Sequence, residues 1–148
     1  MIRVEVSENS FDGAAALAPL AKLGGGAVAS FTGIARADGD VTSIELEYYP
    51  AMTQTCLERL TNEAVAGWSL LGCVLIHRVG RIAVGESIVF VGTAASHRAE
   101  ALEACTYLID RLKTNALFWK KEYRADGSAE WVEAKASDDA RASKWEST

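Results

Sequence analysis

The sequence predicts an α+β fold in which an antiparallel or mixed sheet carries helices on one face. Segments that alternate apolar and polar side chains, as strands do, are interleaved along the chain with segments of helical period. Hairpins outnumber clear strand–helix–strand crossovers, which favours α+β over a parallel α/β sheet. The length of 148 residues and the hydrophobic content of 49% fit one domain over residues 1–148.

The first third of the chain predicts a strand, a helix and a second strand. Residues 2–6 alternate as a half-buried strand does. Residues 11–23 are rich in alanine and leucine, follow the potential cap Asp12 and stop at three glycines, which together predict a helix. Residues 27–32 form the next strand, and the loop GIARADGD contains an Asp38–Gly39 turn.

The middle of the chain predicts a half-buried strand and a long helix. Residues 41–49 place Ile44 and Leu46 on one face and Glu45 and Glu47 on the other, until Pro50 ends the strand. Residues 52–68 carry apolar side chains at four-residue steps, the stripe of an amphipathic helix.

The second half predicts two strong strands, a helix and a hairpin. Residues 73–79 and 87–93 are the strands, and the segment GRIAVGE is the loop between them. Ser96 is positioned to cap a helix that runs to about residue 113. Residues 118–124 and 130–134 form the hairpin around ADGS, and a short helical piece ends at Trp145.

Composition limits the function classes. The net charge of −5 argues against general nucleic-acid binding, and no apolar run is long enough to span a membrane. The N-terminus lacks the pattern of a signal peptide, so we expect a cytoplasmic protein. Three scattered cysteines show no metal-binding spacing, and no metal or other cofactor is expected.

The stretch LKTNALFWKKE joins cations to the most aromatic part of the chain. Lys113 ends the predicted helix, where the helix dipole favours a cation. On the following strand, Lys120 points one way and Lys121 the other, so one of them can share a pocket with Lys113. The alternative is a solvated strand edge on which the lysines block pairing.

Two further segments are candidates for binding an anion. Ser96, His97 and Arg98 start a helix, whose free backbone N–H groups suit a phosphate, although a plain surface pair is the alternative. Arg36 follows a strand on a glycine-containing loop, a weaker signal. His77, at a strand end, is interpreted as a packing histidine. These patterns specify no reaction.

The same residues carry a resemblance to a known family, the large, catalytic subunit of molybdopterin synthase. The matching pieces follow one another along nearly the whole chain: FTGIAR (31–36), LEYYPAM (46–52), IHRVG (76–80), GESIVFVGTAASHR (85–98), LIDRLKTNALFWKKE (108–122) and WVEA (131–134). Each piece is weak alone, but their order and extent are specific.

The resemblance implies an α/β hammerhead-type fold with a small β subdomain and a sulfurtransferase function. The family converts cyclic pyranopterin monophosphate (precursor Z) into molybdopterin, using sulfur from the thiocarboxylated C-terminal glycine of a small ubiquitin-like subunit. It also implies a heterotetramer with a central dimer of large subunits. The alternatives are a non-catalytic module that binds the carrier tail and, less favoured, a pterin- or nucleotide-phosphate-binding protein without a carrier.

Carried over by position, the resemblance assigns the two catalytic lysines to Lys113 and Lys120. It places substrate binding on these lysines and on a further set: Ile34, Ala35, Arg36, His97, Arg98, Lys121 and Glu122. It further implies that the His–Arg pair reaches a site shared across the dimer. Two anionic reactants must meet in one pocket, so cations are expected there to offset their repulsion. Lys113 is expected to stabilise oxyanion charge, and Lys120 is expected to transfer a proton.

Some positions depart from the family pattern. Ile34 stands where a basic residue is common, residues Asn115, Ala116 and Leu117 replace the more usual Arg-Ala-Pro, and Lys135 stands where arginine is frequent. The loss of charge at Ile34 and Asn115 affects the expected phosphate contacts but leaves the two lysines, Arg36 and the His–Arg pair in place.

Overall fold

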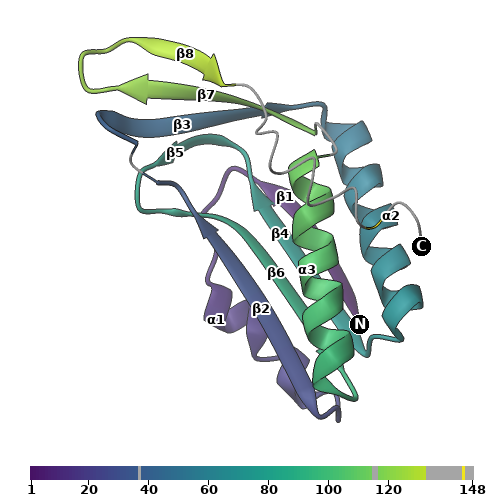
Figure 1. Cartoon of the computed structure of the whole chain (residues 1–148). Coiled ribbons are helices and arrows are strands. Elements are labelled where there is room, and N and C mark those ends of the chain that lie inside the picture. Colours follow the sequence, from purple (N-terminus) through teal and green to yellow (C-terminus); the bar gives the residue numbers. More distant parts are fainter. Residues whose placement is uncertain (37, 115–116, 133–144, 146–148) are drawn as a thin grey trace.

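The structure, a computed structural model, describes residues 1–36, 38–114, 117–132 and 145. Its elements follow one another along the chain as β1 (Ile2–Ser7), α1 (Gly13–Leu17), the 3-10 helix η1 (Leu20–Lys22), β2 (Ala27–Ile34), β3 (Val41–Tyr48), α2 (Pro50–Trp68), β4 (Gly72–Arg78), β5 (Gly80–Ala83), β6 (Ser87–Ala95), α3 (Arg98–Thr114), β7 (Phe118–Arg124) and β8 (Ala129–Val132). Figure 1 shows two sheets, with the long helices α2 and α3 beside one of them.

The larger sheet has the strand order β1–β4–β6–β2. β1 and β4 are parallel, and the other two pairs are antiparallel, so the sheet is mixed as predicted. β4 is buried along its whole length because it is a central strand with side chains packed on both faces. β1 and β2 are the two edges.

The smaller sheet has the order β5–β3–β7–β8 and is antiparallel throughout. It lies above the larger sheet in Figure 1, and the chain passes from β4 of one sheet into β5 of the other. The α+β fold and the small β subdomain are therefore confirmed.

The main core lies between the larger sheet and helices α2 and α3. It joins Leu57 and Leu60 of α2, Leu75 of β4, and Ala104 and Leu108 of α3, all nearly or fully buried. The short α1 and η1 cover the opposite face, so helices occupy both faces rather than one. A third cluster fills the inner side of the smaller sheet.

Two predicted elements differ from the structure. The expected helix at 11–23 is broken into α1 and η1, because Pro19 lacks the N–H that a continuous helix needs. The expected loop at 80–86 contains β5, which pairs with β3. β5 has only four residues, too short for its alternation to be recognised in the sequence.

Trp145 lies against the two long helices. Its ring contacts Trp68 of α2 and Tyr107 of α3, and its indole N–H donates to Asp110 at 2.9 Å. The rest of the predicted C-terminal helical piece lies outside the described residues. Within the described ranges, no helix is long and apolar enough to cross a membrane.

Candidate functional site

The two lysines of the opening stretch lie where α3 ends and β7 begins. Lys113 is in the last turn of α3, and Lys120 is the third residue of β7. Leu112, just before Lys113, and Leu117, which precedes β7, are both buried in the main core. Figure 1 shows this end of α3 directed at the smaller sheet. The arrangement predicted for the lysines, on two successive elements, is confirmed.

The register of β7 decides which lysine faces the interior. Lys120 stands opposite Leu46 of β3, and Phe118, on the same face, packs into the core. Lys121 points to the other face, where its ammonium nitrogen lies 5.4 Å from the centre of the Trp131 ring. Lys120 is therefore the lysine on the inner side, and Lys121 does not share that face.

His77 lies where the two lysine-bearing elements meet. Its ring is stacked on that of Phe118, with the ring centres 4.0 Å apart. Its Nδ1–H donates to the carbonyl of Arg78 at 2.7 Å, which leaves Nε2 as the acceptor. Burial lowers the pKa of His77 to about 4, the Arg78 hydrogen bond opposes this shift, and the charge of Lys113 adds to it.

The interpretation of His77 as a packing histidine is confirmed, because the side chain is 8% exposed. Its position beside the lysines was missed. The alternation of side chains along β4 could have revealed this position. His77 and Leu75 point to the same face of the strand, the face that α3 covers.

The loop after β2 lies at the same end of the molecule as Lys113. Ile34 is exposed, and the Arg36 guanidinium makes an exposed ion pair of 3.2 Å with Asp38. Ala35 is buried, its N–H donates to Glu86 and its carbonyl accepts from Gly85. Ala35 therefore fixes the loop, and Arg36 is the group in this loop that can reach an anion.

His97 and Arg98 lie at the opposite end of α3 from Lys113. Both side chains are exposed. A helix of 17 residues is about 25 Å long, so one chain does not bring these two residues to the lysines. Both residues lie at the start of the helix, as predicted, but the predicted set is divided between two ends of the molecule.

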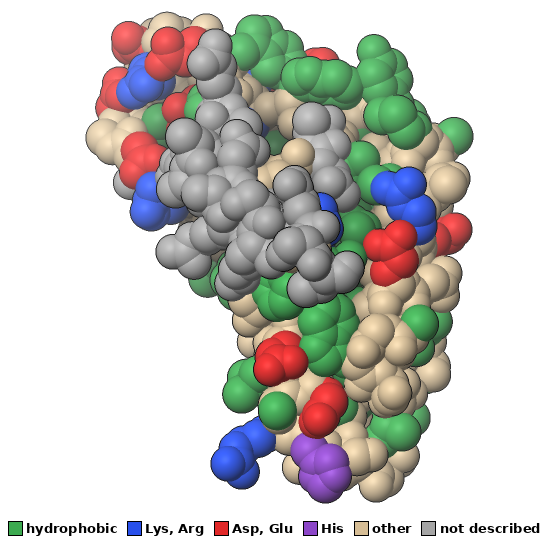
Figure 2. Space-filling model, turned by 45° about the vertical axis from the view of Figure 1, so that its right-hand side comes forward, with side chains coloured by type: hydrophobic (Ala, Val, Ile, Leu, Met, Phe, Trp, Pro, Cys, Tyr) green, Lys and Arg blue, Asp and Glu red, His purple; other side chains and the backbone are tan. Residues whose placement is uncertain are grey.

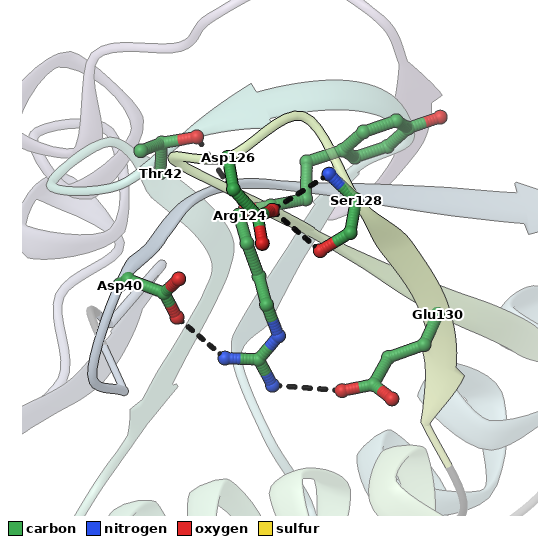
Figure 3. A network of polar contacts seen from close by, with 7 residues as sticks. Asp40, Thr42, Arg124, Asp126, Ser128 and Glu130 are labelled. Atoms are coloured by element: carbon green, nitrogen blue, oxygen red, sulfur yellow. Dashed lines mark hydrogen bonds and ion pairs between the residues drawn. The ribbon is translucent and has the colours of Figure 1, made fainter.

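Arg124, another cation near the lysines in sequence, serves the hairpin instead. It binds Asp40 at 2.6 Å and Glu130 at 2.7 Å (Figure 3). The hydrogen bonds to Glu130 and Asp40 raise the pKa of Arg124. Asp126 closes the β7–β8 turn by accepting from the backbone and the hydroxyl of Ser128, which lowers the pKa of Asp126. The Arg124 side chain therefore stabilises the hairpin.

Exposed aromatic side chains surround a shallow cavity on the outer face of the smaller sheet. Trp119 and Tyr49 meet edge to face at 5.1 Å, and Trp131 is 53% exposed. The cavity is about 320 Å³ and is also lined by Glu47 and Tyr48. Figure 2 shows hydrophobic side chains gathered at the upper end of the molecule. Exposed aromatics of this kind are typical of protein interfaces.

The remaining predicted positions complete the site. Glu122 shares the inner face of β7 with Lys120 and stands opposite Ile44. Asn115 and Lys135, two of the departures from the family pattern, lie outside the described residues.

Among the residues that are described, no three His, Cys, Asp or Glu side chains are grouped to hold a metal ion. The junction therefore offers cations and a neutral imidazole, the means for binding anions and moving protons.

Comparisons with known proteins found related sequences and a similar solved structure. The sequence matches the family described as MoaE protein over residues 6–115. A molybdopterin synthase catalytic subunit from Mesorhizobium japonicum is 45% identical, over 98% of this chain and 94% of the relative. One from Rhizobium meliloti is 43% identical, over 97% and 96%. A solved structure, the molybdopterin biosynthesis MoaE protein from Burkholderia ambifaria, has a TM-score of 0.82 and 40% identity, with 98% of both chains covered.

Proposed function

The chain belongs to the MoaE protein family, and from this premise we propose that it is the catalytic subunit of molybdopterin synthase. In this role it transfers sulfur from the thiocarboxylated C-terminus of a small carrier protein to cyclic pyranopterin monophosphate. The observation that carries the proposal is the junction of α3 and β7. There the charge of Lys113 acts on the His77 ring, and Phe118, two residues before Lys120, stacks on the same ring.

The proposed chemistry needs positive charge in one place. The thiocarboxylate sulfur attacks a carbon of the pterin side chain and displaces an oxygen, to which Lys120 donates a proton. The resulting thioester between carrier and pterin is then hydrolysed by water, which leaves the sulfur on the pterin and a carboxylate on the carrier. Lys113 stabilises the oxyanion that develops during hydrolysis. A neutral His77 suits this site, because it adds no further charge beside the lysines.

The carrier protein is the proposed partner. The relatives are named as subunits, which means that each is one part of a larger enzyme. The aromatic surface around Tyr49, Trp119 and Trp131 lies on the sheet that carries Lys120, and it offers the kind of side chain on which a folded partner packs. In this arrangement the body of the carrier contacts the surface while its extended tail reaches the lysines.

Reconstitution tests the proposal. The chain is mixed with a thiocarboxylated carrier and cyclic pyranopterin monophosphate, and dithiolene formation is followed by mass spectrometry. Lys113→Ala and Lys120→Ala are expected to fold and to lose about 100-fold or more of the rate, the usual effect of removing an electrostatic or proton-transfer group. Lys22→Ala, an exposed lysine of η1, is the matched control.

The outcomes separate the candidate functions. Product from wild type and Lys22→Ala but not from the two variants supports the enzyme. Carrier binding without product from wild type would instead favour the non-catalytic module. Lys121→Ala decides the role of the second strand lysine: from its place on the opposite face of β7, we expect a smaller loss than for Lys120→Ala.

A further inference from the structure

Arg78, the last residue of β4, is a buried arginine. Its side chain is only 8% exposed, although arginine is seldom buried unless it is well paired. One terminal nitrogen donates to the carboxylate of Glu86 at 3.3 Å, and the other donates to the carbonyl of Glu8, also at 3.3 Å. The Nε of Arg78 is buried as well and has no hydrogen-bond partner among the described residues. Arg78 has thus lost its water shell and gained two long contacts.

Such an arrangement does little for the stability of the fold. The attraction within a buried ion pair offsets the loss of water only when the geometry is excellent, and an apolar side chain of similar size often serves a core equally well. Glu86 is 45% exposed, so its carboxylate would stay hydrated without Arg78. The arginine therefore indicates a role in holding Glu86 in place.

Glu86 closes the turn between β5 and β6 and joins it to the end of β2. Its carboxylate accepts from the N–H of Ala83 at 2.8 Å, and its own N–H donates to the carbonyl of Ala83 at 3.1 Å. The bond from Ala83 lowers the pKa of Glu86 most, and the charge of Arg78 lowers it further, which keeps the carboxylate ionised. The backbone carbonyl of Glu86 accepts from the N–H of Ala35 at 2.9 Å.

Ala35 is held from both sides where β2 ends. In addition to the bond just described, Gly85 donates to the carbonyl of Ala35 at 2.7 Å. The register of β2 against β6 shifts between Gly33 and Ile34, immediately before this point. Irregularities of this kind change the direction of a strand and re-aim the side chains that follow. Because Arg36 is the next residue, the direction in which it leaves the sheet depends on Ala35.

We propose that Arg78 is a positioning residue, which acts through Glu86 to fix the direction of Arg36. The exposed ion pair between Arg36 and Asp38 is of a kind that contributes little, so the backbone of the loop sets where the Arg36 guanidinium lies. Arg78 itself touches no reacting group. The inference rests on the proposed function for the identity of the anion that Arg36 binds, whereas the link between Arg78 and the loop does not.

The backbone of Arg78 serves the other half of the site. Its carbonyl accepts from Nδ1–H of His77, whose ring is stacked on Phe118 of β7. A substitution of the Arg78 side chain leaves this carbonyl in place. Arg78→Met is therefore expected to disturb the loop that carries Arg36 and to spare the two lysines.

Hydrogen exchange measures the link to the loop without any activity. The amides of Ala35 and Gly85 are hydrogen-bonded, so they are expected to exchange slowly in wild type. Arg78→Met is expected to speed their exchange about 10-fold or more, the effect of losing a hydrogen bond to a charged group. Arg59→Met removes the arginine of an exposed ion pair on α2 and is the matched control, in which both amides should exchange as in wild type.

A second variant breaks the same contact from the other side. Glu86→Gln keeps the length of the side chain and an oxygen that can accept from Ala83, but it removes the charge that attracts Arg78. We expect faster exchange of the amides of Ala35 and Gly85 here too. Circular dichroism shows whether each variant is folded.

Steady-state kinetics test the consequence for substrate binding. Arg36→Ala is expected to raise the KM for cyclic pyranopterin monophosphate about 10-fold or more, because a charged donor is lost. Arg78→Met is expected to raise KM about 3- to 10-fold with little change in kcat, because Arg36 is displaced but the lysines keep their places.

Combining the two substitutions separates positioning from general destabilisation. If Arg78 acts through Arg36, Arg78→Met adds nothing to the KM of Arg36→Ala, because the group that it positions is already absent. A merely structural role would reduce the amount of folded enzyme, which lowers the apparent kcat in both backgrounds and leaves KM unchanged.

Three results would overturn the inference. Amides of Ala35 and Gly85 that exchange equally fast in wild type and both variants would show that the ion pair does not hold the loop. An additive rise of KM in the double variant would show that Arg78 does not act through Arg36, and a fall of kcat with unchanged KM would show a structural role. A wild type that forms no product would contradict the proposed function alone, because hydrogen exchange still decides whether Arg78 holds the loop.

Discussion

At the scale of single residues, His77 shows how burial sets a charge state. The folded protein holds the pKa of His77 at about 4, below the ordinary value of 6.5, mainly because burial disfavours the charged ring. Between these two values the unfolded chain binds a proton that the folded chain does not bind. The contribution of His77 to stability is therefore complete above pH 6.5 and is lost as the pH falls toward 4.

The direction of this pKa shift predicts how the stability of the protein depends on pH. A difference of about 2.5 pH units corresponds to about 3 kcal/mol of unfolding free energy lost on acidification. We expect His77→Phe, which cannot titrate, to flatten the dependence of that free energy on pH between 6.5 and 4, measured by urea unfolding at several pH values. His97→Gln, at an exposed histidine, should keep the wild-type slope; an unchanged slope in His77→Phe would contradict the assignment.

At the scale of elements, the glycines before β2 hold the strand against the start of α3. A Cβ on Gly26 would lie 2.5 Å from the carbonyl oxygen of Ser96, a backbone atom that cannot easily move. The sequence suggested that these glycines only stop a helix. The structure shows that Gly26 also lets β2 approach the segment that carries His97.

A pair of glycine substitutions tests this close approach. Gly26→Ala is expected to lower the free energy of unfolding by about 1–3 kcal/mol, the range for overpacking. Gly67→Ala, in an exposed part of α2 with no atom near the added Cβ, is expected to raise it by about 0.5–1 kcal/mol. Chemical denaturation of both variants is the measurement, and equal effects would show that packing at Gly26 is not the cause.

The sequence predicts those features of the site that lie within a single strand or helix. The alternation of β7 correctly separated Lys120 from Lys121, because strand parity is a local property. The helix that separates His97 from Lys113 was also predicted, and its length alone keeps these residues apart. What the sequence did not show is the meeting of β4 with β7 at His77, since that contact joins two sheets and has no local pattern. β5 was missed for a different reason, because its four residues are too few to show an alternation.

At the scale of the whole molecule, the distribution of charge matters more than its sum. The net charge is −5, yet the proposed site gathers Arg36, Lys113 and Lys120 to receive two anionic reactants. Attraction of this kind is screened by salt over a Debye length of about 8–10 Å at moderate ionic strength.

The corresponding prediction concerns binding rather than chemistry. Raising the salt from about 50 to 500 mM is expected to increase the KM for cyclic pyranopterin monophosphate several-fold, because screening weakens the approach of the phosphate. The value of kcat should change less, because salt screens charges that are far apart more strongly than groups already held in contact. Steady-state kinetics at several salt concentrations provide the measurement, and a KM that does not depend on salt would contradict electrostatic capture.

The strand order of the larger sheet has a consequence for synthesis of the chain. β1 pairs with β4, so Ile2 meets Cys73, and β2 must wait for β6, whose last residue is Ala95. Nearly two thirds of the protein must therefore leave the ribosome before this sheet can close, and until then the uncharged β2 segment has no partner. Sequence-distant pairing of this kind slows folding and exposes strands to aggregation. The nascent chain is thus most vulnerable during the interval between the synthesis of β2 and that of β6.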